Sequence, residues 1–263
     1  MRTAVVIADL GDVGAGAVVR AMAANSNAAM LVLPAQLSLA CWEHTISSTG
    51  RAVTRIALRD GRTLVDDEVA ALLCRCYSFP MPRFARSSQA DCDYASAELR
   101  ALAVSWLRGL GARVVNAVDG VSMTGPSWSP RRALVEAQRV GLPVAATSIA
   151  TSGRLLPGFV GSPYAARLPA EECSGDSVGE VLVAGREAFG ALAHRFGAAC
   201  VALAARARCR VLEVGFCHAA GDVAVSRISP VPPLHHQWQA EIVATLLASV
   251  SQAADALPVR APQ

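Results

Sequence analysis

The first 33 residues restrict the fold of this chain most strongly. Residues 3–9 form an apolar run typical of a buried strand, and a glycine-rich stretch follows at 11–16. The residues up to 24 are typical of a helix, and 29–33 are typical of a second strand. Strand, glycine turn, helix and strand in this order predict a βαβ unit with parallel neighbouring strands. The chain is therefore expected to be an α/β protein.

Two later segments carry strong local signals. Residues 51–64 alternate around Asp60-Gly61, which predicts a hairpin. Residues 89–110 have apolar side chains at helical spacing, Ser88 as a cap and Gly111 as a stop, which predicts a long helix. Further elements are expected as a short helical turn at 66–68, strands at 70–77, 113–116, 143–149, 178–183, 200–204, 210–216 and 222–228, and helices at 130–140, 186–196 and 235–254.

Residues 151–175 interrupt this pattern, because glycine, proline and small polar residues dominate there. We therefore predict an α/β domain over 1–150, an irregular linker over 151–177, a second lobe over 178–256 and a tail over 257–263. A chain of 263 residues is long enough for one large domain or for two small lobes.

All 24 basic residues of the chain are arginine. A P-loop needs a lysine on the phosphates, and Schiff-base chemistry needs a lysine amine. Arginine cannot replace a compact amine that must lose its proton. The composition therefore excludes both classes of mechanism, although a general drift from lysine to arginine explains most of the surface positions.

Composition also sets expectations for partners and location. The net charge of +3 without a basic run argues against nucleic acid binding, and no apolar run reaches the length of a membrane span. The eight cysteines form no CxxC pair, and the N-terminal segment lacks the order of a signal peptide, so a cytoplasmic location is expected. Hydrophobic residues make up 53% of the chain, which is compatible with a homodimer or a complex with a partner enzyme.

Several segments together resemble the RimK-like ATP-grasp ligases. These segments are VAALLCRCYSFP at 69–80, ADCDYASAELRALAVSWLRGL at 90–110, GARVVNA at 111–117, QRVGLPV at 138–144 and FGALAHRFGAACVALAARARCRVLEVGF at 189–216. The resemblance implies a pre-ATP-grasp-like parallel sheet with flanking helices, followed by an ATP-grasp-like α+β lobe. It covers about two thirds of the chain and depends on the order and spacing of the segments.

The chain departs from this family at the positions that would bind nucleotide and metal. The resemblance places the first phosphate-binding lysine near Ser129, and Arg131 and Arg132 follow it. It places the first metal-binding acid near Ala202, the second at Glu213 and the partner asparagine at Gly215. The chain between residues 149 and 178 is too short for the family's lid lobe. One carboxylate cannot hold the metal that bridges phosphates, so we expect loss of ordinary ATP-dependent ligation.

The residues themselves suggest sites for a small anion. Gly14 and Gly16 lie between a strand and a helix, where an anion can bind, although a tight helix entry explains them as well. Arg75 lies at the C-terminal end of a central strand and Arg83 follows Pro82, near the sheet edge where α/β proteins bind ligands. The alternative for these arginines is an ion pair with one of the acids at the start of the long helix, Asp91, Asp93 and Glu98.

Cysteine and histidine offer weaker candidates. Cys74 and Cys76 share one face of a strand and suit either a metal or the core. Glu213, Cys217 and His218 could contribute to a metal site, and Cys217 could act as a nucleophile, but their spacing fits no compact motif.

Three hypotheses follow from the sequence. The first is a non-catalytic ATP-grasp-like protein, without a cofactor, that binds a small acid, a peptide or a partner enzyme in a biosynthetic pathway. The second is an active but altered carboxylate–amine ligase that uses ATP and magnesium with Arg75, Arg131 and Glu213. The third is an enzyme of another class that uses Cys217, His218 and Glu213, with or without a metal.

Overall fold

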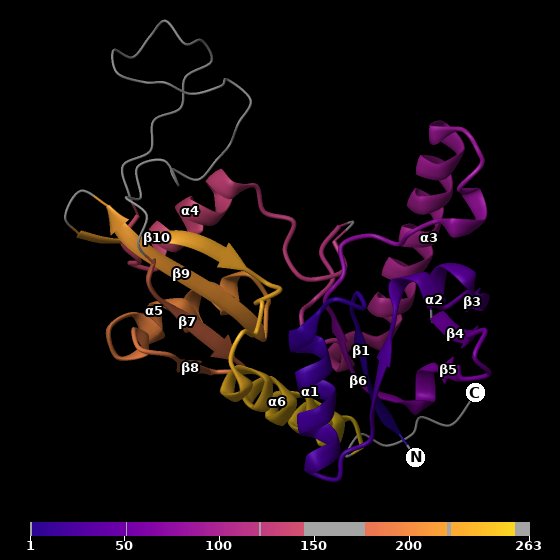
Figure 1. The fold of residues 1–263 in the computed structure, drawn as a ribbon, viewed down its shortest axis with the longest axis horizontal. Helices are drawn as coiled ribbons and strands as arrows, with labels where there is room; N and C mark the ends of the chain where they lie inside the picture. Colours follow the sequence, from indigo (N-terminus) through magenta and orange to yellow (C-terminus); the bar gives the residue numbers. More distant parts are fainter. Residues whose placement is uncertain (1, 51, 121, 145–176, 220–221, 256–263) are drawn as a thin grey trace, which may run out of the picture. The chain divides into compact units, whose positions relative to one another are not determined.

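The computed structural model describes residues 2–50, 52–120, 122–144, 177–219 and 222–255 (Figure 1). The chain forms two compact units, and neither is continuous in sequence. The first unit comprises Met1–Ser127, Arg208–Val211 and Pro230–Gln263, and the second comprises Trp128–Ala207 and Leu212–Ser229. This division differs from the predicted one, because the C-terminal helix belongs to the first unit and not to a lobe over 178–256.

The centre of the first unit is a three-stranded parallel sheet in the order β2-β1-β6. Its strands are β1 (Thr3–Ile7), β2 (Ala29–Val32) and β6 (Val69–Cys74). Every residue of β6 is buried, as expected for a parallel strand covered on both faces. The α/β class and the parallel arrangement are confirmed.

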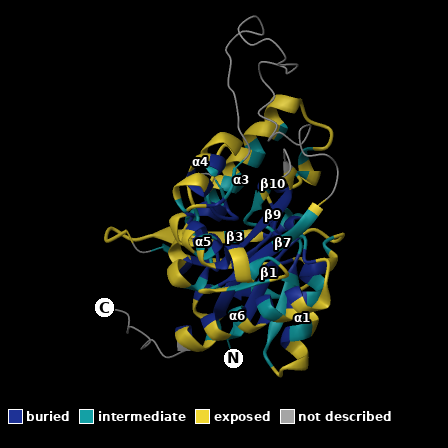
Figure 2. Cartoon of the chain, turned by 90° about the vertical axis from the view of Figure 1, so that its left-hand side faces the viewer, coloured by how far each residue is buried: buried dark blue, intermediate teal, exposed yellow. Residues whose placement is uncertain are grey.

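Two helices lie side by side in this unit, α1 (Val13–Ala24) and α6 (Gln237–Asp255), and α6 also packs against β6 (Figure 1). Asp12 caps α1, since its Oδ1 accepts a 2.9 Å hydrogen bond from the amide of Ala15. Buried residues gather on the strands of the structure, and exposed residues lie along the outer faces of the helices (Figure 2).

The long helix α3 spans Gln89–Leu110, as predicted. Ser88 accepts a hydrogen bond from the amide of Asp91 at its start, and Gly111 ends it with a φ of 59°. The buried residues of α3 lie in its second half, where Trp106 packs edge-on against Trp42 with ring centroids 5.6 Å apart. The first unit also contains three short 3-10 helices, which are η1 (Asp66–Glu68), η2 (Pro82–Phe84) and η3 (Gly111–Arg113).

A second, antiparallel sheet of the first unit has the order β3-β4-β5. It contains β3 (Cys41–Ile46), β4 (Ala52–Ala57) and β5 (Thr63–Val65). The hairpin at Asp60-Gly61 is confirmed, whereas β3 and the helix α2 (Pro34–Leu39) before it were not predicted.

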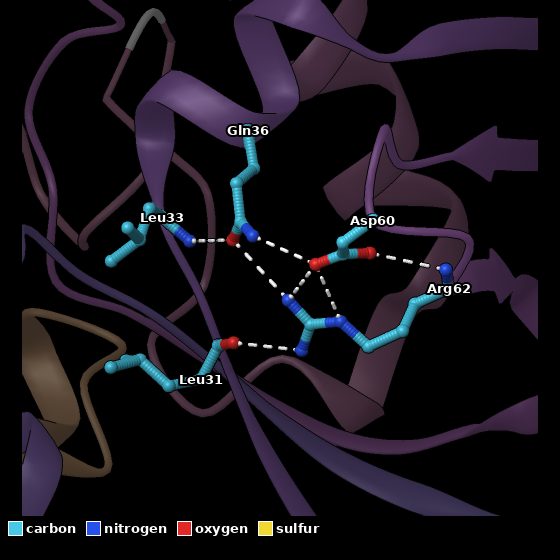
Figure 3. A network of polar contacts seen from close by, with 5 residues as sticks. All are labelled: Leu31, Leu33, Gln36, Asp60 and Arg62. Carbon is cyan, nitrogen blue, oxygen red and sulfur yellow. Dashed lines mark hydrogen bonds and ion pairs between the residues drawn. The ribbon is translucent and has the colours of Figure 1, made fainter.

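A polar network fixes the tip of this hairpin to the start of α2 (Figure 3). The guanidinium of Arg62 contacts the carboxylate of Asp60 at 2.7 Å and donates to the carbonyl of Leu31 at 3.1 Å. The side chain of Gln36 donates to Asp60 at 2.9 Å and accepts from the amide of Leu33 at 2.9 Å. The hairpin is therefore held against the end of β2 by the side chains of Asp60 and Arg62 in its turn and of Gln36 in α2.

The second unit contains a four-stranded sheet in the order β10-β9-β7-β8. Its elements are β7 (Ser177–Ala184), β8 (Glu187–Phe189), β9 (Val211–Ala219), β10 (Asp222–Ser229), α4 (Pro130–Arg139) and α5 (Ala193–Arg206). Phe196 of α5 stacks on Phe216 of β9 with centroids 4.7 Å apart. The carboxylate of Glu136 on α4 accepts hydrogen bonds from Arg206 of α5 and from Arg139.

The structure corrects three predicted elements. Residues 186–196, predicted as a helix, contain strand β8 and only the beginning of α5, and Gly190 between them has a φ of 114°. Residues 200–204, predicted as a strand, lie inside α5, because a short apolar run does not distinguish a buried strand from a buried helix. Residues 113–116 form isolated bridges and no strand. The predicted strand 143–149 falls largely outside the described residues, as does the predicted linker. No described helix combines the length and apolar character that crossing a bilayer requires.

Candidate functional site

The second unit buries an acidic side chain, Glu213, in the middle of its sheet. Glu213 lies near the start of β9, and its side chain is 0% exposed. In the β9–β10 pair Ser229 lies opposite Glu213, and Arg227 lies opposite Gly215. The guanidinium of Arg227 forms an ion pair with Oε1 of Glu213. A further acid, Glu180 of β7, has its Oε2 3.9 Å from Nη2 of Arg227.

Local geometry brings Arg227 to this carboxylate. The register of β10 shifts between Val225 and Arg227, so one additional residue is accommodated at Ser226. A Cβ at Gly215 would lie 3.4 Å from Cβ of Arg227 and 3.7 Å from its Nε, so the arginine passes directly over the glycine. The glycine therefore leaves room for the arm of Arg227 to reach across the sheet.

The chemistry of this pair differs from that of a metal site. Mg²⁺ requires oxygen ligands, whereas a guanidinium only donates hydrogen bonds and carries its own positive charge. A carboxylate already paired with arginine gains less from a divalent cation, because the two cations repel each other. As arranged, Glu213 serves an ion pair between neighbouring strands.

The structure shows the surroundings of the positions inferred from the family resemblance. Ala202, the position given for the first metal acid, lies within helix α5 and not on a strand beside Glu213. Gly215, the position given for the asparagine, lies two residues beyond Glu213 on β9, and Arg227 lies opposite it. Ser129, the position given for a lysine, caps α4 by accepting a 3.3 Å hydrogen bond from the amide of Arg132.

The proposed metal ligands Glu213, Cys217 and His218 do not gather into a site. Cys217 is buried and disulfide-bonded, so its sulfur is not a thiolate in this state. His218 is exposed, as expected for a neighbour on the opposite face of a strand. Within the described ranges, no three side chains of histidine, cysteine, aspartate or glutamate are grouped so that they could hold a metal ion.

Arg75 occupies the carboxyl edge of the parallel sheet, as its position after β6 predicts. Its side chain is 3% exposed, and it forms a two-point ion pair with Asp12, with Nε 2.7 Å from Oδ2 and Nη2 3.1 Å from Oδ1. The partner is therefore the cap of α1, and not one of the acids at the start of α3. The ion pair joins the loops that follow β1 and β6.

The predicted glycines of the first loop differ in their surroundings. A Cβ at Gly14 would lie 2.7 Å from the carbonyl oxygen of Pro233 and 2.8 Å from Cβ of Leu234. A Cβ at Gly16 would meet only the flexible end of Arg20, at 3.3 Å. Gly14 is thus required for the close approach of α1 to the segment before α6, which supports the packing explanation at that position.

The other predicted arginines point to separate places. Arg83 in η2 is exposed and donates a 2.9 Å hydrogen bond to the carbonyl of Leu39 at the end of α2. Arg131 is exposed in the first turn of α4, and the neighbouring Arg132 lies 5.7 Å above the ring of Trp128. The structure describes no single site shared by the predicted arginines.

Two cysteines at the end of β6 do come together. The sulfurs of Cys74 and Cys76 are 3.8 Å apart, and both residues are buried. The contact with Cys76 lowers the pKa of Cys74, and the same contact, together with burial, raises the pKa of Cys76. They fit the interpretation as small residues of the core.

Sequence reasoning identified Glu213 but missed Arg227. Strand 222–228 was predicted, yet the partner of Glu213 depends on the antiparallel register and on the bulge at Ser226, and neither has a local sequence signal. Asn116, noted only for its resemblance to a family motif, proves to be structural. Its side chain donates to the carbonyls of Thr124, Val211 and Pro230 and accepts from the amides of Arg210 and Val211.

Comparisons with known proteins support the fold. No model of a protein family matches the chain, and no curated protein matches its sequence. Among solved structures, a RiPP-associated ATP-grasp ligase of Chryseobacterium gregarium, in complex with ADP and a leader and core peptide, has a TM-score of 0.69 at 12% identity, covering 95% of this chain and 97% of that one.

Two further structures show the same similarity. The macrocyclase MdnC of Microcystis aeruginosa, bound with its precursor peptide MdnA, has a TM-score of 0.68 at 12% identity and covers 94% of this chain and 99% of that one. A RimK domain ATP-grasp protein of Sphaerobacter thermophilus has a TM-score of 0.50 at 18% identity, with 94% and 99% covered. The chain therefore has an ATP-grasp fold of the RimK-like type.

Proposed function

We propose that this chain is a non-catalytic ATP-grasp-like protein that binds a small acid, a peptide or a partner enzyme in a biosynthetic pathway. The observation that carries the proposal is the ion pair of Arg227 with Glu213. The resemblance makes Glu213 a metal acid, and here an arginine from the paired strand neutralises it. A protein that cannot clamp magnesium on its sheet has lost the main charge stabilisation of phosphoryl transfer.

The composition supports the loss of catalysis, and the structural neighbours support the binding of a peptide. The absence of lysine removes the side chain that the family uses on the phosphates, and Ser129 at one of these positions is a helix cap. The ligases of similar fold are bound to leader, core or precursor peptides, which makes a peptide a natural ligand for this chain. The loss of the lid lobe remains part of the proposal, because residues 145–176 lie outside the described ranges.

An active ligase is the second candidate, and the extent of the fold similarity favours it. The similarity spans 95% of this chain and 97% of the Chryseobacterium gregarium ligase, so it includes the sheet that carries Glu213. In this case Glu213 would hold magnesium and ATP would be a cofactor, and Arg227 would have to leave the carboxylate first. The third candidate, an enzyme built on Cys217 and His218, gains no support from their surroundings.

Thermal unfolding with ATP and magnesium distinguishes the first two candidates. A ligand at 100 times its Kd stabilises the folded state by about 2.7 kcal/mol. We expect no magnesium-dependent rise in Tm for the wild type. A clear rise that requires both ATP and magnesium would support the active ligase and contradict the proposal.

A charge reversal provides a sensitive comparison. Arg227→Glu places a second carboxylate on the strand paired with Glu213, and we expect this variant to gain stabilisation by Mn²⁺. Arg186→Glu is the matched control, because Arg186 is exposed in the same unit and not in contact with Glu213. Equal Mn²⁺ responses of the wild type and both variants would show that Arg227 does not govern metal access.

A further inference from the structure

A groove in the first unit lies between η2 and the first half of α3. It has a volume of about 530 Å³, and its apolar wall is formed by Met81, Phe84 and Tyr94. Tyr94 is 69% exposed. The rim carries two acids, Asp91 and Glu98.

One face of α3 supplies most of this groove. Asp91, Tyr94, Ala95 and Glu98 follow each other at spacings of three and four residues, so they lie on the same face of the helix. The buried residues of α3 begin at Ala103, and the partly buried Leu99 also packs against the core, so the residues before Leu99 are not part of the described core cluster. Such a face is available to a partner.

Two hydrogen bonds fix the positions of residues at the groove. Cys92 donates from its Sγ to the carbonyl of Phe84 at 3.0 Å, which ties α3 to the end of η2. Ser88 donates a 2.7 Å hydrogen bond to the carboxylate of Asp91 and fixes the position of this acid on the rim. Preformed walls reduce the entropy that binding must overcome.

Charge identifies the kind of partner. The two rim acids are two helical turns apart, with Tyr94 between them, and neither forms an ion pair within the described structure. The nearby Arg83 is paired with neither acid, since its guanidinium donates a hydrogen bond to the carbonyl of Leu39. An apolar wall with acids on both sides is complementary to an apolar side chain flanked by cations.

We infer that this groove binds a peptide segment in which a leucine or an aromatic residue is flanked by arginine or lysine. Tyr94 and Phe84 contact the apolar side chain, and Asp91 and Glu98 receive the basic ones. The inference deepens the proposed binding role by naming the chemistry of a peptide partner, and it rests on that role. It does not depend on the loss of ATP-dependent catalysis.

Selection from a displayed library of random 12-residue peptides tests this inference with the intact chain. We expect enriched peptides to carry arginine or lysine beside phenylalanine, tyrosine or leucine. Tyr94→Ala should weaken the enriched peptides at least tenfold, and the double variant Asp91→Asn with Glu98→Gln should weaken them several-fold and reduce their salt dependence. Fluorescence anisotropy of the labelled peptides measures both effects.

Matched variants separate a groove effect from a general one. Tyr77→Ala removes an equally exposed tyrosine, 63% against 69%, that does not line the groove, and Glu43→Gln with Glu68→Gln removes two exposed acids elsewhere. Both controls should leave binding unchanged, and thermal melts should confirm that every variant is folded. Selection of acidic peptides, no selection at all, or equal binding to Tyr94→Ala would overturn the inference.

Three further outcomes are decisive. If Tyr94→Ala converts a dimer into a monomer in sedimentation experiments, a second copy covers the groove and the inference is wrong. If no peptide binds while ATP and magnesium still leave the Tm unchanged, the inference that the groove binds a peptide is wrong. The proposed loss of ATP-dependent catalysis is then unaffected. If peptides bind at the groove and ATP also binds, the non-catalytic proposal fails alone.

Discussion

The two units each contain an ion pair between an arginine and an acid, and the two pairs are built in opposite ways. In the first unit the arginine is the buried partner, since the side chain of Arg75 is 3% exposed and that of Asp12 is 17% exposed. In the second unit the acid is buried, since Glu213 is 0% exposed and Arg227 is 48% exposed. The first pair joins two loops and caps a helix. The second places a movable surface arginine on a fixed internal carboxylate.

The two ion pairs therefore differ in role. The pair of Asp12 with Arg75 is structural, whereas the pair of Glu213 with Arg227 involves a candidate site residue. Asp12 and Arg75 contact each other at two points, and Asp12 also accepts from the amide of Ala15, so neither group is available to a ligand without disrupting α1. The side chain of Arg227 is half-exposed, so a rotation into solvent would leave the arginine solvated and the buried carboxylate of Glu213 without this counter-charge. Removal of Arg227 from the second pair would leave the carboxylate of Glu213 able to bind a metal ion.

The largest effect is expected for Arg75→Ala. Removal of one member of a buried ion pair leaves the other without its counter-charge and costs about 3–5 kcal/mol. Because Asp12 retains some solvent contact, we expect the lower end, about 3 kcal/mol, in the free energy of urea unfolding. Surface ion pairs contribute about 1 kcal/mol or less. A loss of unfolding free energy in that range for Arg75→Ala would show that this pair is not a buried structural pair.

A smaller and asymmetric effect is expected in the second unit. Arg227→Ala leaves the charge of Glu213 inside the sheet and should lower the unfolding free energy by about 2 kcal/mol. Glu213→Gln leaves an exposed arginine that water can solvate, and it should cost about 1 kcal/mol or less. Equal costs in urea unfolding would show that the burial of the two partners does not determine their roles.

The stability of the second unit should also depend on pH through Glu136. Its hydrogen bond with Arg206, followed by the charges of Arg206 and Arg139, holds the pKa of Glu136 below its ordinary value of 4.5. A lowered folded pKa means that this stabilisation is complete above about pH 4.5 and is lost as the pH falls through the folded pKa. Glu136→Gln should therefore flatten the acid limb of stability against pH, whereas Glu43→Gln on an exposed strand should not.

Asp66 of the first unit titrates in the opposite sense. Burial raises its pKa above 3.8, against the hydrogen bonds that it accepts from Thr54 and Trp106. A raised folded pKa means that protonation favours the folded state, so Asp66 contributes no acid-induced loss. If the acid limb of Glu136→Gln matched that of the wild type, the loss would have to arise from other carboxyl groups.

The smallest effect is expected at the tip of the hairpin. Arg62 and Asp60 are both 37% exposed, so water screens their ion pair, although Gln36 and Leu31 also hold the guanidinium (Figure 3). Arg62→Ala should lower the free energy of unfolding less than Arg75→Ala or Arg227→Ala does. Added salt should further reduce the difference in stability between Arg62→Ala and the wild type. A loss as large as that of Arg75→Ala would show that the hairpin is a central support of the first unit.

Local signals predicted the fold well where they were complete. Helix α3 has its predicted bounds because Ser88 and Gly111 mark its ends, and the hairpin follows from Asp60-Gly61. Residues 200–204 were misassigned because five apolar residues fit either a strand or a buried helix turn. The site was harder to predict, because the partners of Arg75 and Glu213 are 63 and 14 residues away and depend on tertiary contacts and strand register.

We propose that the ion pair of Arg227 with Glu213 excludes a metal ion from this carboxylate. Crystals grown with Mn²⁺ and a non-hydrolysable ATP analogue test it directly through anomalous scattering of manganese. The account predicts the guanidinium of Arg227 against Glu213 and no anomalous peak beside that carboxylate. A manganese peak at coordination distance from Glu213, with the analogue bound to it and Arg227 turned away, would contradict the account.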